Sequence, residues 1–303
     1  MSQPSPSSPA PTLSRKRVFF TRLSSTLGLW AVMGTGIWMG NTTVVLTVAV
    51  LLGLAGSWEY AKLTRDDEQP GFARWGLLLS TAYWVATLVW YARHGEALPF
   101  AADLLLLAIG TQGAFLLCYQ HQLEGAATLR RIFTVLFGWV YTVLLYAFLP
   151  RIICLPALGE ALPPNGIMLL LFVVMVTKFT DMGAYAFGVL WGRRKMIPHI
   201  SPAKTWEGLG GAFVGAFLAA SCMMALAGEN LAPLTWTHVL ILAPVLCLLG
   251  VTGDLAESVI KRCIAIKDTG HAFPGIGGIL DLTDSLLFTG PVFYFYLEFL
   301  RRA

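Results

Sequence analysis

The sequence predicts an all-α integral membrane protein, a polytopic helical bundle of about nine transmembrane helices with its N-terminus in the cytoplasm. Three observations predict this class. Hydrophobic residues make up 56% of the 303 residues and charged residues only 13%, whereas a soluble protein has about 25% charged residues. Apolar runs close to the ~20 residues that cross a bilayer recur along the chain. Lys and Arg concentrate on alternate connections between these runs, as the positive-inside rule requires.

The composition also excludes several classes of protein. So little charge, with a net value of only +4, fits neither a disordered protein nor one that binds nucleic acid. The five cysteines form no CxxC pair and the five histidines show no ligand spacing. We therefore expect neither a disulfide framework nor a zinc site. The chain can stay folded only if much of its surface faces lipid.

Residues 1–23 are predicted to form a disordered basic tail. This segment is rich in Ser and Pro, lacks apolar periodicity and ends among basic residues. No small-residue cleavage site separates it from the first apolar run. We therefore expect a retained span and not a signal peptide.

Nine apolar runs follow this tail. The first is short and rich in Gly, and we expect it to pair with the second as a tight hairpin. The eighth is also short and contains Pro244, which neighbouring helices can accommodate. We expect the nine runs to divide into an N-terminal transmembrane part, 24–166, and a C-terminal catalytic part, 167–303. The predicted spans are 24–40, 43–60, 75–92, 99–118, 132–150, 167–188, 207–227, 238–253 and 285–300.

Alternating the connections from a cytoplasmic N-terminus places most basic residues on one side of the membrane. The opposite side holds Arg93, Arg151, Arg301 and Arg302, while Lys178 lies within a span. An eight-helix arrangement would return the C-terminal arginine pair to the cytoplasm and is the main alternative. The sixteen of 21 Lys and Arg placed on the cytoplasmic side are Arg15, Lys16, Arg17, Arg22, Lys62, Arg65, Arg74, Arg130, Arg131, Arg193, Arg194, Lys195, Lys204, Lys261, Arg262 and Lys267.

Two cytoplasmic connections stand out, 189–206 and 254–284. The second is longer than the ~12–15 residues beyond which a loop is usually functional or disordered. It contains Ile and Leu at intervals and a Gly-rich turn at 274–278. We therefore expect an ordered, re-entrant structure.

Lys178 and Asp181 lie three residues apart in an apolar run, and hence on one face of the predicted helix. A charge at membrane depth costs at least about 2.5–3.5 kcal/mol on insertion scales. Two interpretations stay open: a mutually neutralising pair that locks the helix, or a pair that lines a polar cavity. Small residues from Gly183 to Gly188 favour close helix packing beside them.

The segment 201–211 combines donors, a cation and glycines just before a predicted helix. Ser201, Lys204 and Thr205 supply polar groups, and a helix N-terminus offers free N–H groups that suit phosphate. The alternative is an ordinary capping segment. The segment is not a Walker A loop, because the required spacing is absent.

The connection 254–284 carries the strongest signal. Asp254 and Glu257 are three residues apart, and Asp281 and Asp284 repeat that spacing. If both pairs are helical, each presents its acids on one face, and carboxylates so arranged suit Mg²⁺. The basic residues between them could hold phosphate oxygens, as phosphoryl or nucleotidyl transfer requires. A merely solvated charged loop is the alternative. The basic residues concerned are Lys261, Arg262 and Lys267.

These residues resemble the signature of the phosphatidate cytidylyltransferase family, also called CDP-diglyceride synthetases. The signature is matched without a gap over 258–284, and the element at 201–208 is similar as well. The resemblance covers the C-terminal half, about 177–290. Ile276 stands where the family usually has His, and Leu282 where it usually has Arg. The matching signature residues are Ser258, Lys261, Arg262, Lys267, Asp268, Gly270, Phe273, Pro274, Gly277, Gly278, Asp281 and Asp284.

The resemblance implies an enzyme of phospholipid biosynthesis that makes CDP-diacylglycerol and pyrophosphate from CTP and phosphatidate. It implies the inner membrane of a bacterium, an active site facing the cytoplasm, Mg²⁺ as cofactor with a monovalent cation left open, and a possible homodimer. The two departures would mean a divergent active enzyme, an altered nucleotide preference or an inactive relative.

The residues divide into three implied roles. The implied catalytic residues are Asp254, Asp281, Lys261 and Lys267. The implied metal ligands are Asp254, Asp281, Asp284 and Glu257. The implied substrate-binding residues are Lys178, Asp181, Ser201, Lys204, Thr205, Arg262, Asp268, Gly277 and Gly278.

Other functions remain as alternatives. A transporter would suit the intramembrane charges, but it should spread polar groups over several helices, and no internal repeat is evident. A CDP-alcohol phosphotransferase would need Gly after the second acid of its motif, where this chain has Ser285. The sequence does not clearly distinguish a phosphatidate cytidylyltransferase from a lipid kinase or from a cytidylyltransferase for another lipid.

Overall fold

The computed structural model describes residues 34–35, 40–66, 68–120, 122–156, 165–264 and 278–302. The N-terminal helices are α2 (Thr42–Leu63), α3 (Gly71–His94), α4 (Phe100–Cys118), α5 (Ala126–Trp139), the π-helix η1 (Val140–Leu144) and α6 (Phe148–Ile153). The C-terminal elements are α7 (Asn165–Trp191), β1 (Lys195–Ile197), β2 (Ser201–Thr205), α8 (Trp206–Ala227), the 3-10 helix η2 (Gly228–Leu231), α9 (Trp236–Cys263) and α10 (Ile279–Arg302).

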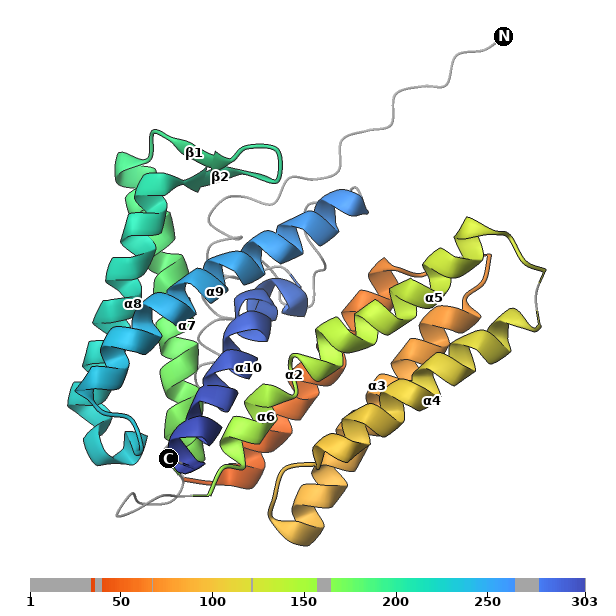
Figure 1. Cartoon of the computed structure of the whole chain (residues 1–303), viewed down its shortest axis with the longest axis horizontal. Helices are drawn as coiled ribbons and strands as arrows, with labels where there is room; N and C mark the ends of the chain where they lie inside the picture. Colours follow the sequence, from red (N-terminus) through yellow and green to blue (C-terminus); the bar gives the residue numbers. More distant parts are fainter. Residues whose placement is uncertain are drawn as a thin grey trace.

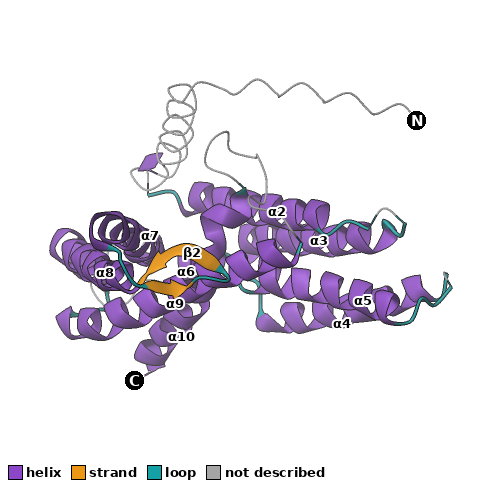
Figure 2. Ribbon diagram, turned by 90° about the horizontal axis from the view of Figure 1, so that it is seen from above, coloured by secondary structure: helices purple, strands orange, loops and turns teal. Residues whose placement is uncertain are grey.

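The helices form two adjoining groups. Figure 1 shows α7, α8, α9 and α10 on one side and α2 to α5 on the other, and the view from above in Figure 2 separates the same groups. Helix α6 lies between them, and the hairpin β1–β2 caps one end of the C-terminal group. The C-terminal group contains most of the residues singled out from the sequence.

Among the described residues, seven helical segments are long and apolar enough to cross a membrane. The segment 126–153, which comprises α5, η1 and α6, counts as one of them. Helix α10 contains the predicted span 285–300 and is long enough, but it is not apolar enough to count with the seven. The predicted span 24–40 lies almost entirely outside the described residues. A membrane-spanning helical bundle is therefore confirmed, whereas the total of nine and the cytoplasmic N-terminus stay predictions.

Two boundaries differ from the predictions. The connection 189–206 is not wholly irregular, because it contains an antiparallel two-stranded sheet that pairs Lys195 with Thr205. The fold is thus mostly but not entirely α-helical. The connection 254–284 is much shorter than expected, because α9 continues to Cys263 and α10 already begins at Ile279. Charged residues at the end of α9 lower its local hydropathy without interrupting the helix.

Local sequence signals explain several helix ends. Asn41 caps α2 by accepting a hydrogen bond from the Val44 N–H (3.2 Å), and Thr205 caps α8 by accepting one from the Gly208 N–H (3.1 Å). Thr235 and His238 form a capping box at the start of α9. These side chains satisfy N–H groups that the first helical turn leaves without a partner.

Helices α7 and α8 pack with their backbones in direct contact. An added Cβ at Gly183 would collide with the Gly211 carbonyl, and one at Gly211 would collide with the Gly183 carbonyl. Small residues allow such an approach in membrane helices. The close packing predicted beside Lys178 and Asp181 is confirmed, and it fixes the α7–α8 pair on which one wall of the site is built.

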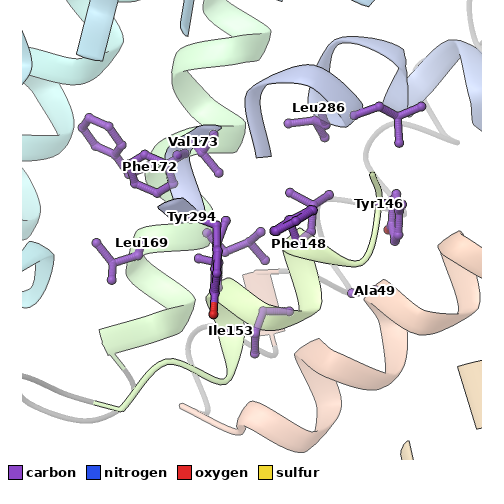
Figure 3. Close-up of a cluster of buried hydrophobic side chains, with 14 of the residues drawn as sticks. Ala49, Tyr146, Phe148, Ile153, Leu169, Phe172, Val173, Leu286 and Tyr294 are labelled. Atoms are coloured by element: carbon purple, nitrogen blue, oxygen red, sulfur yellow. The ribbon is translucent and has the colours of Figure 1, made fainter. Parts of the chain in front are cut away.

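A hydrophobic core joins the two groups of helices. Phe148 of α6 lies against Tyr294 of α10, with ring centroids 5.4 Å apart, and Phe172 of α7 stacks on Phe293 at 5.6 Å. Nearby, the buried Arg151 pairs with Asp103 of α4 at 2.8 Å. The core residues labelled in Figure 3 are Ala49, Tyr146, Phe148, Ile153, Leu169, Phe172, Val173, Leu286 and Tyr294.

Candidate active site

A cavity of about 330 Å³, lined by both charged and apolar residues, lies where α7, α8, α9, α10 and the β1–β2 hairpin meet. It is the place where most of the described residues singled out from the sequence come together. Its lining includes seven of them: Asp181, Ser201, Lys204, Thr205, Asp254, Asp281 and Asp284.

Three carboxylates form a compact cluster at this cavity. Asp254, Glu257 and Asp284 each offer an oxygen, and these atoms all lie within 4.8 Å of one another. Glu257 and Asp284 are buried, with exposed fractions of 1% and 5%. The i, i+3 spacing of Asp254 and Glu257 places both acids on the face of α9 that meets α10.

Gly253 brings the two helices of this cluster together. A Cβ added there would lie 2.6 Å from the Asp284 carbonyl oxygen, so a larger residue would force α9 and α10 apart. The absence of a side chain at this position is what allows Asp284 to lie beside the acids of α9.

Asp281 belongs to a second, adjoining arrangement. Lys261 donates hydrogen bonds to Glu257 at 2.8 Å and to Asp281 at 2.7 Å. The other Asp281 oxygen accepts a hydrogen bond from the Gly278 N–H at 2.7 Å. Of the four predicted metal ligands, three thus form the cluster, and Asp281 is joined to it through Lys261.

The hairpin supplies Lys204 to the opposite wall. The Lys204 ammonium lies 2.7 Å from an Asp254 carboxylate oxygen and donates to the Val251 carbonyl at 3.1 Å. Ser201 and Thr205, at the two ends of β2, also line the cavity. Thr205 also caps α8. The segment is therefore both a capping segment and part of the cavity wall.

Lys178 and Asp181 lie on α7 at the side of the cavity. Their charged atoms are 3.8 Å apart, and Lys178 donates a hydrogen bond to the Leu282 carbonyl at 2.8 Å. Asp181 lines the cavity, with 36% of its side chain exposed. The arrangement fits the cavity-lining interpretation, because the ion pair is long and does not bury the carboxylate.

The remaining predicted residues are less closely associated with the cavity. Arg262 is exposed and donates to the Ile200 carbonyl at the hairpin turn (3.4 Å), so it connects α9 to the hairpin. Gly278 lies at the start of α10. The other predicted positions, Lys267, Asp268, Ile276 and Gly277, lie outside the described residues.

One residue near the site is absent from the prediction. Glu59 of α2 is buried, with 3% exposed, and accepts a hydrogen bond from the Leu280 N–H at 2.9 Å. An acid within an apolar run is costly and by itself marks a functional position. The sequence shows this acid within its apolar run. Nothing in the sequence indicates that its hydrogen-bond partner, Leu280, lies 221 residues away.

Comparison with known proteins gives a consistent result. A model of the "Cytidylyltransferase family" matches residues 20–300. An uncharacterised protein of Escherichia coli K12, YnbB, is 34% identical over 199 residues, which cover 65% of this chain and 64% of that protein. A phosphatidate cytidylyltransferase of Bacillus subtilis is 40% identical over 44% of this chain and 48% of its own length.

A phosphatidate cytidylyltransferase of Haemophilus influenzae is similar to the same extent, with 38% identity over 44% of this chain and 47% of its own length. The chain therefore spans about half the length of the relatives that carry this name, and somewhat less than two thirds of the Escherichia coli protein.

Proposed function

Because the chain belongs to the Cytidylyltransferase family, we propose that it is a membrane nucleotidyltransferase that makes CDP-diacylglycerol and pyrophosphate from CTP and phosphatidate. The observation that carries the proposal is the cluster of Asp254, Glu257 and Asp284, which Lys204 and Lys261 flank and which adjoins the cavity. The names of the bacterial relatives support the choice of substrates. We also propose a place in a bacterial inner membrane with the cavity facing the cytoplasm, which the concentration of Lys and Arg on one predicted side supports.

In the proposed reaction no protein group has to form a covalent bond with the substrate. An oxygen of the lipid phosphate attacks the α-phosphorus of CTP, and the bond from that phosphorus to the bridging oxygen breaks. Pyrophosphate leaves with the electron pair. The nucleophile is already anionic, so no covalent enzyme intermediate is required. The obstacle is the approach of two anions, which fixed positive charge and positioning reduce.

The carboxylate cluster fits Mg²⁺, which prefers several oxygen ligands and usually shares its shell with substrate phosphates. Two of the three acids are buried, and Glu257 has one oxygen, Oε1, without a hydrogen-bond partner among the described residues. Asp254, Glu257 and Asp284 would hold the ion, with Asp281 supporting them through Lys261. When bound, Mg²⁺ supplies charge neutralisation at the phosphates.

The lysines are proposed to hold the phosphates. Lys204 is fixed at the cavity by Asp254, and Lys261 is fixed beside it by Asp281, which lines the cavity. Both cations are therefore in place before substrate arrives. Asp181 and Lys178 would line the approach of the lipid headgroup from the membrane. Arg262, which contacts the turn of the hairpin, is also proposed to bind substrate, as are Lys267, Asp268 and Gly277, which lie outside the described residues. The monovalent cation and the homodimer stay predictions that rest on the family resemblance.

The direct test uses protein purified in detergent with Mg²⁺, labelled CTP and phosphatidate. We expect labelled CDP-diacylglycerol, and we expect Asp254→Asn and Asp281→Ala to lower its rate at least about 100-fold, as losses of catalytic-site charges do. Glu298→Gln, at the other end of α10, is the control and should keep the wild-type rate. Product at the wild-type rate in both site variants would refute the proposed site.

A further inference from the structure

Glu59 connects the N-terminal group of helices to the start of α10. Its carboxylate is buried, and its Oε2 accepts the Leu280 N–H at 2.9 Å. One turn earlier on α2, a Cβ added at Gly56 would lie 3.6 Å from a Leu280 methyl group and 3.7 Å from one of Ile279. Helix α2 therefore packs directly on the first residues of α10, and Glu59 is the polar group within that contact.

The start of α10 has half of a capping box. Gly278 precedes the first helical residue, and its N–H is bound by the side chain of Asp281, the third residue of the helix. In a complete capping box the residue before the helix also contributes a side-chain oxygen to an N–H of the first turn. Gly278 has no side chain to do this. Glu59 binds the N–H of Leu280, the second residue of the helix, and so fills the missing half from a distant segment.

This cap acts on a residue of the proposed active site. Asp281 lies next to Leu280 and holds Lys261 at 2.7 Å, and Lys261 in turn holds Glu257 at 2.8 Å. If the first turn of α10 frays, Asp281 loses its fixed position relative to Lys261 and Glu257. An uncapped helix end frays readily, because its first N–H groups lack partners.

We propose that Glu59 is a positioning residue of the active site, which completes the cap of α10 and thereby holds Asp281 against Lys261. The inference rests on the proposed function insofar as Asp281 and Lys261 act in catalysis. It also gives the N-terminal half of the chain a direct part in the site, although the cavity lining comes from the C-terminal half.

The test compares Glu59→Met, which keeps the length of the side chain but has no oxygen acceptor, with Glu59→Gln, which keeps an oxygen for the Leu280 N–H. Ser57→Ala, at another buried polar residue of α2, is the matched control. We expect Glu59→Met to lower kcat about tenfold, the order of effect of losing a helix cap, with KM for CTP changed less than twofold. Glu59→Gln should recover at least half of the wild-type kcat, and Ser57→Ala should leave both constants unchanged.

Hydrogen exchange provides a readout that does not depend on activity. In Glu59→Met the amides of 280–284 should exchange about tenfold faster than in wild type, while those of 293–302 stay unchanged. Equal kinetics and exchange in Glu59→Met and Ser57→Ala would overturn the inference, as would a Glu59→Gln protein no better than Glu59→Met. A wild-type protein that makes no CDP-diacylglycerol would refute the proposed function, and the exchange comparison would still decide the role of Glu59.

Discussion

Replacing Lys261 by Met should strongly destabilise the protein. Only 15% of the Lys261 side chain is exposed, and its two partners, Glu257 and Asp281, are 2% and 16% exposed. A hydrogen bond to a charged group contributes about 1.5–3 kcal/mol, and breaking a buried ion pair costs about 3–5 kcal/mol because it leaves a charge uncompensated. We expect the free energy of unfolding to fall by about 3–5 kcal/mol.

The assay is the apparent Tm in detergent, measured beside Lys195→Met, the same substitution at an exposed position of the hairpin. At about 2 °C per kcal/mol for a chain of this size, Lys261→Met should lower Tm by at least about 6 °C. Adding Glu257→Gln to Lys261→Met should recover part of that loss, because it removes the uncompensated charge. A Tm within 2 °C of the Lys195→Met protein would refute the reasoning.

Two further predictions concern the wall formed by α9 and α10. Gly253→Ala should reduce activity at least about tenfold, because its Cβ would lie 2.6 Å from the Asp284 carbonyl oxygen and overpacking shifts the backbone. Gly250→Ala, whose nearest new contact is 3.7 Å, is the control and should retain activity. Equal rates of CDP-diacylglycerol formation in the two variants would contradict this prediction. Leu282→Arg should keep the rate within about threefold, because the Leu282 side chain is only partly buried and the substitution keeps the backbone carbonyl that accepts the Lys178 hydrogen bond. Complete loss of product would show that this departure from the family signature matters.

The sequence was sufficient to predict which acids lie close together on each helix, because that depends on local spacing. The pairs Asp254–Glu257 and Asp281–Asp284 each repeat an i, i+3 interval, and in the structure both intervals are helical. One acid of the second pair, Asp284, joins the first pair, while the other turns to Lys261. This division could not be predicted, because it depends on how α9 and α10 meet at Gly253.

Helix boundaries and distant contacts were harder to predict for physical reasons. The last turns of α9 contain several charged residues, which lower the local hydropathy. Partners on α10, such as Asp281 for Lys261, support the segment as a helix. The hairpin strands have three and five residues, too short for a clear alternating pattern. The contact of Glu59 with Leu280 is created by tertiary packing, which the spacing of residues in the sequence does not reveal.

The central claim, cytidylyl transfer to a lipid phosphate, is tested most directly by following the two ends of the CTP triphosphate separately. Purified protein is given phosphatidate and CTP labelled with ³²P either at the α- or at the γ-phosphate, and the lipid extract is counted. We predict that the α-label enters the lipid while the γ-label is released as pyrophosphate. Entry of the γ-label would identify a lipid kinase instead, and absence of both labels from phosphatidate and from other lipid phosphates would contradict the account.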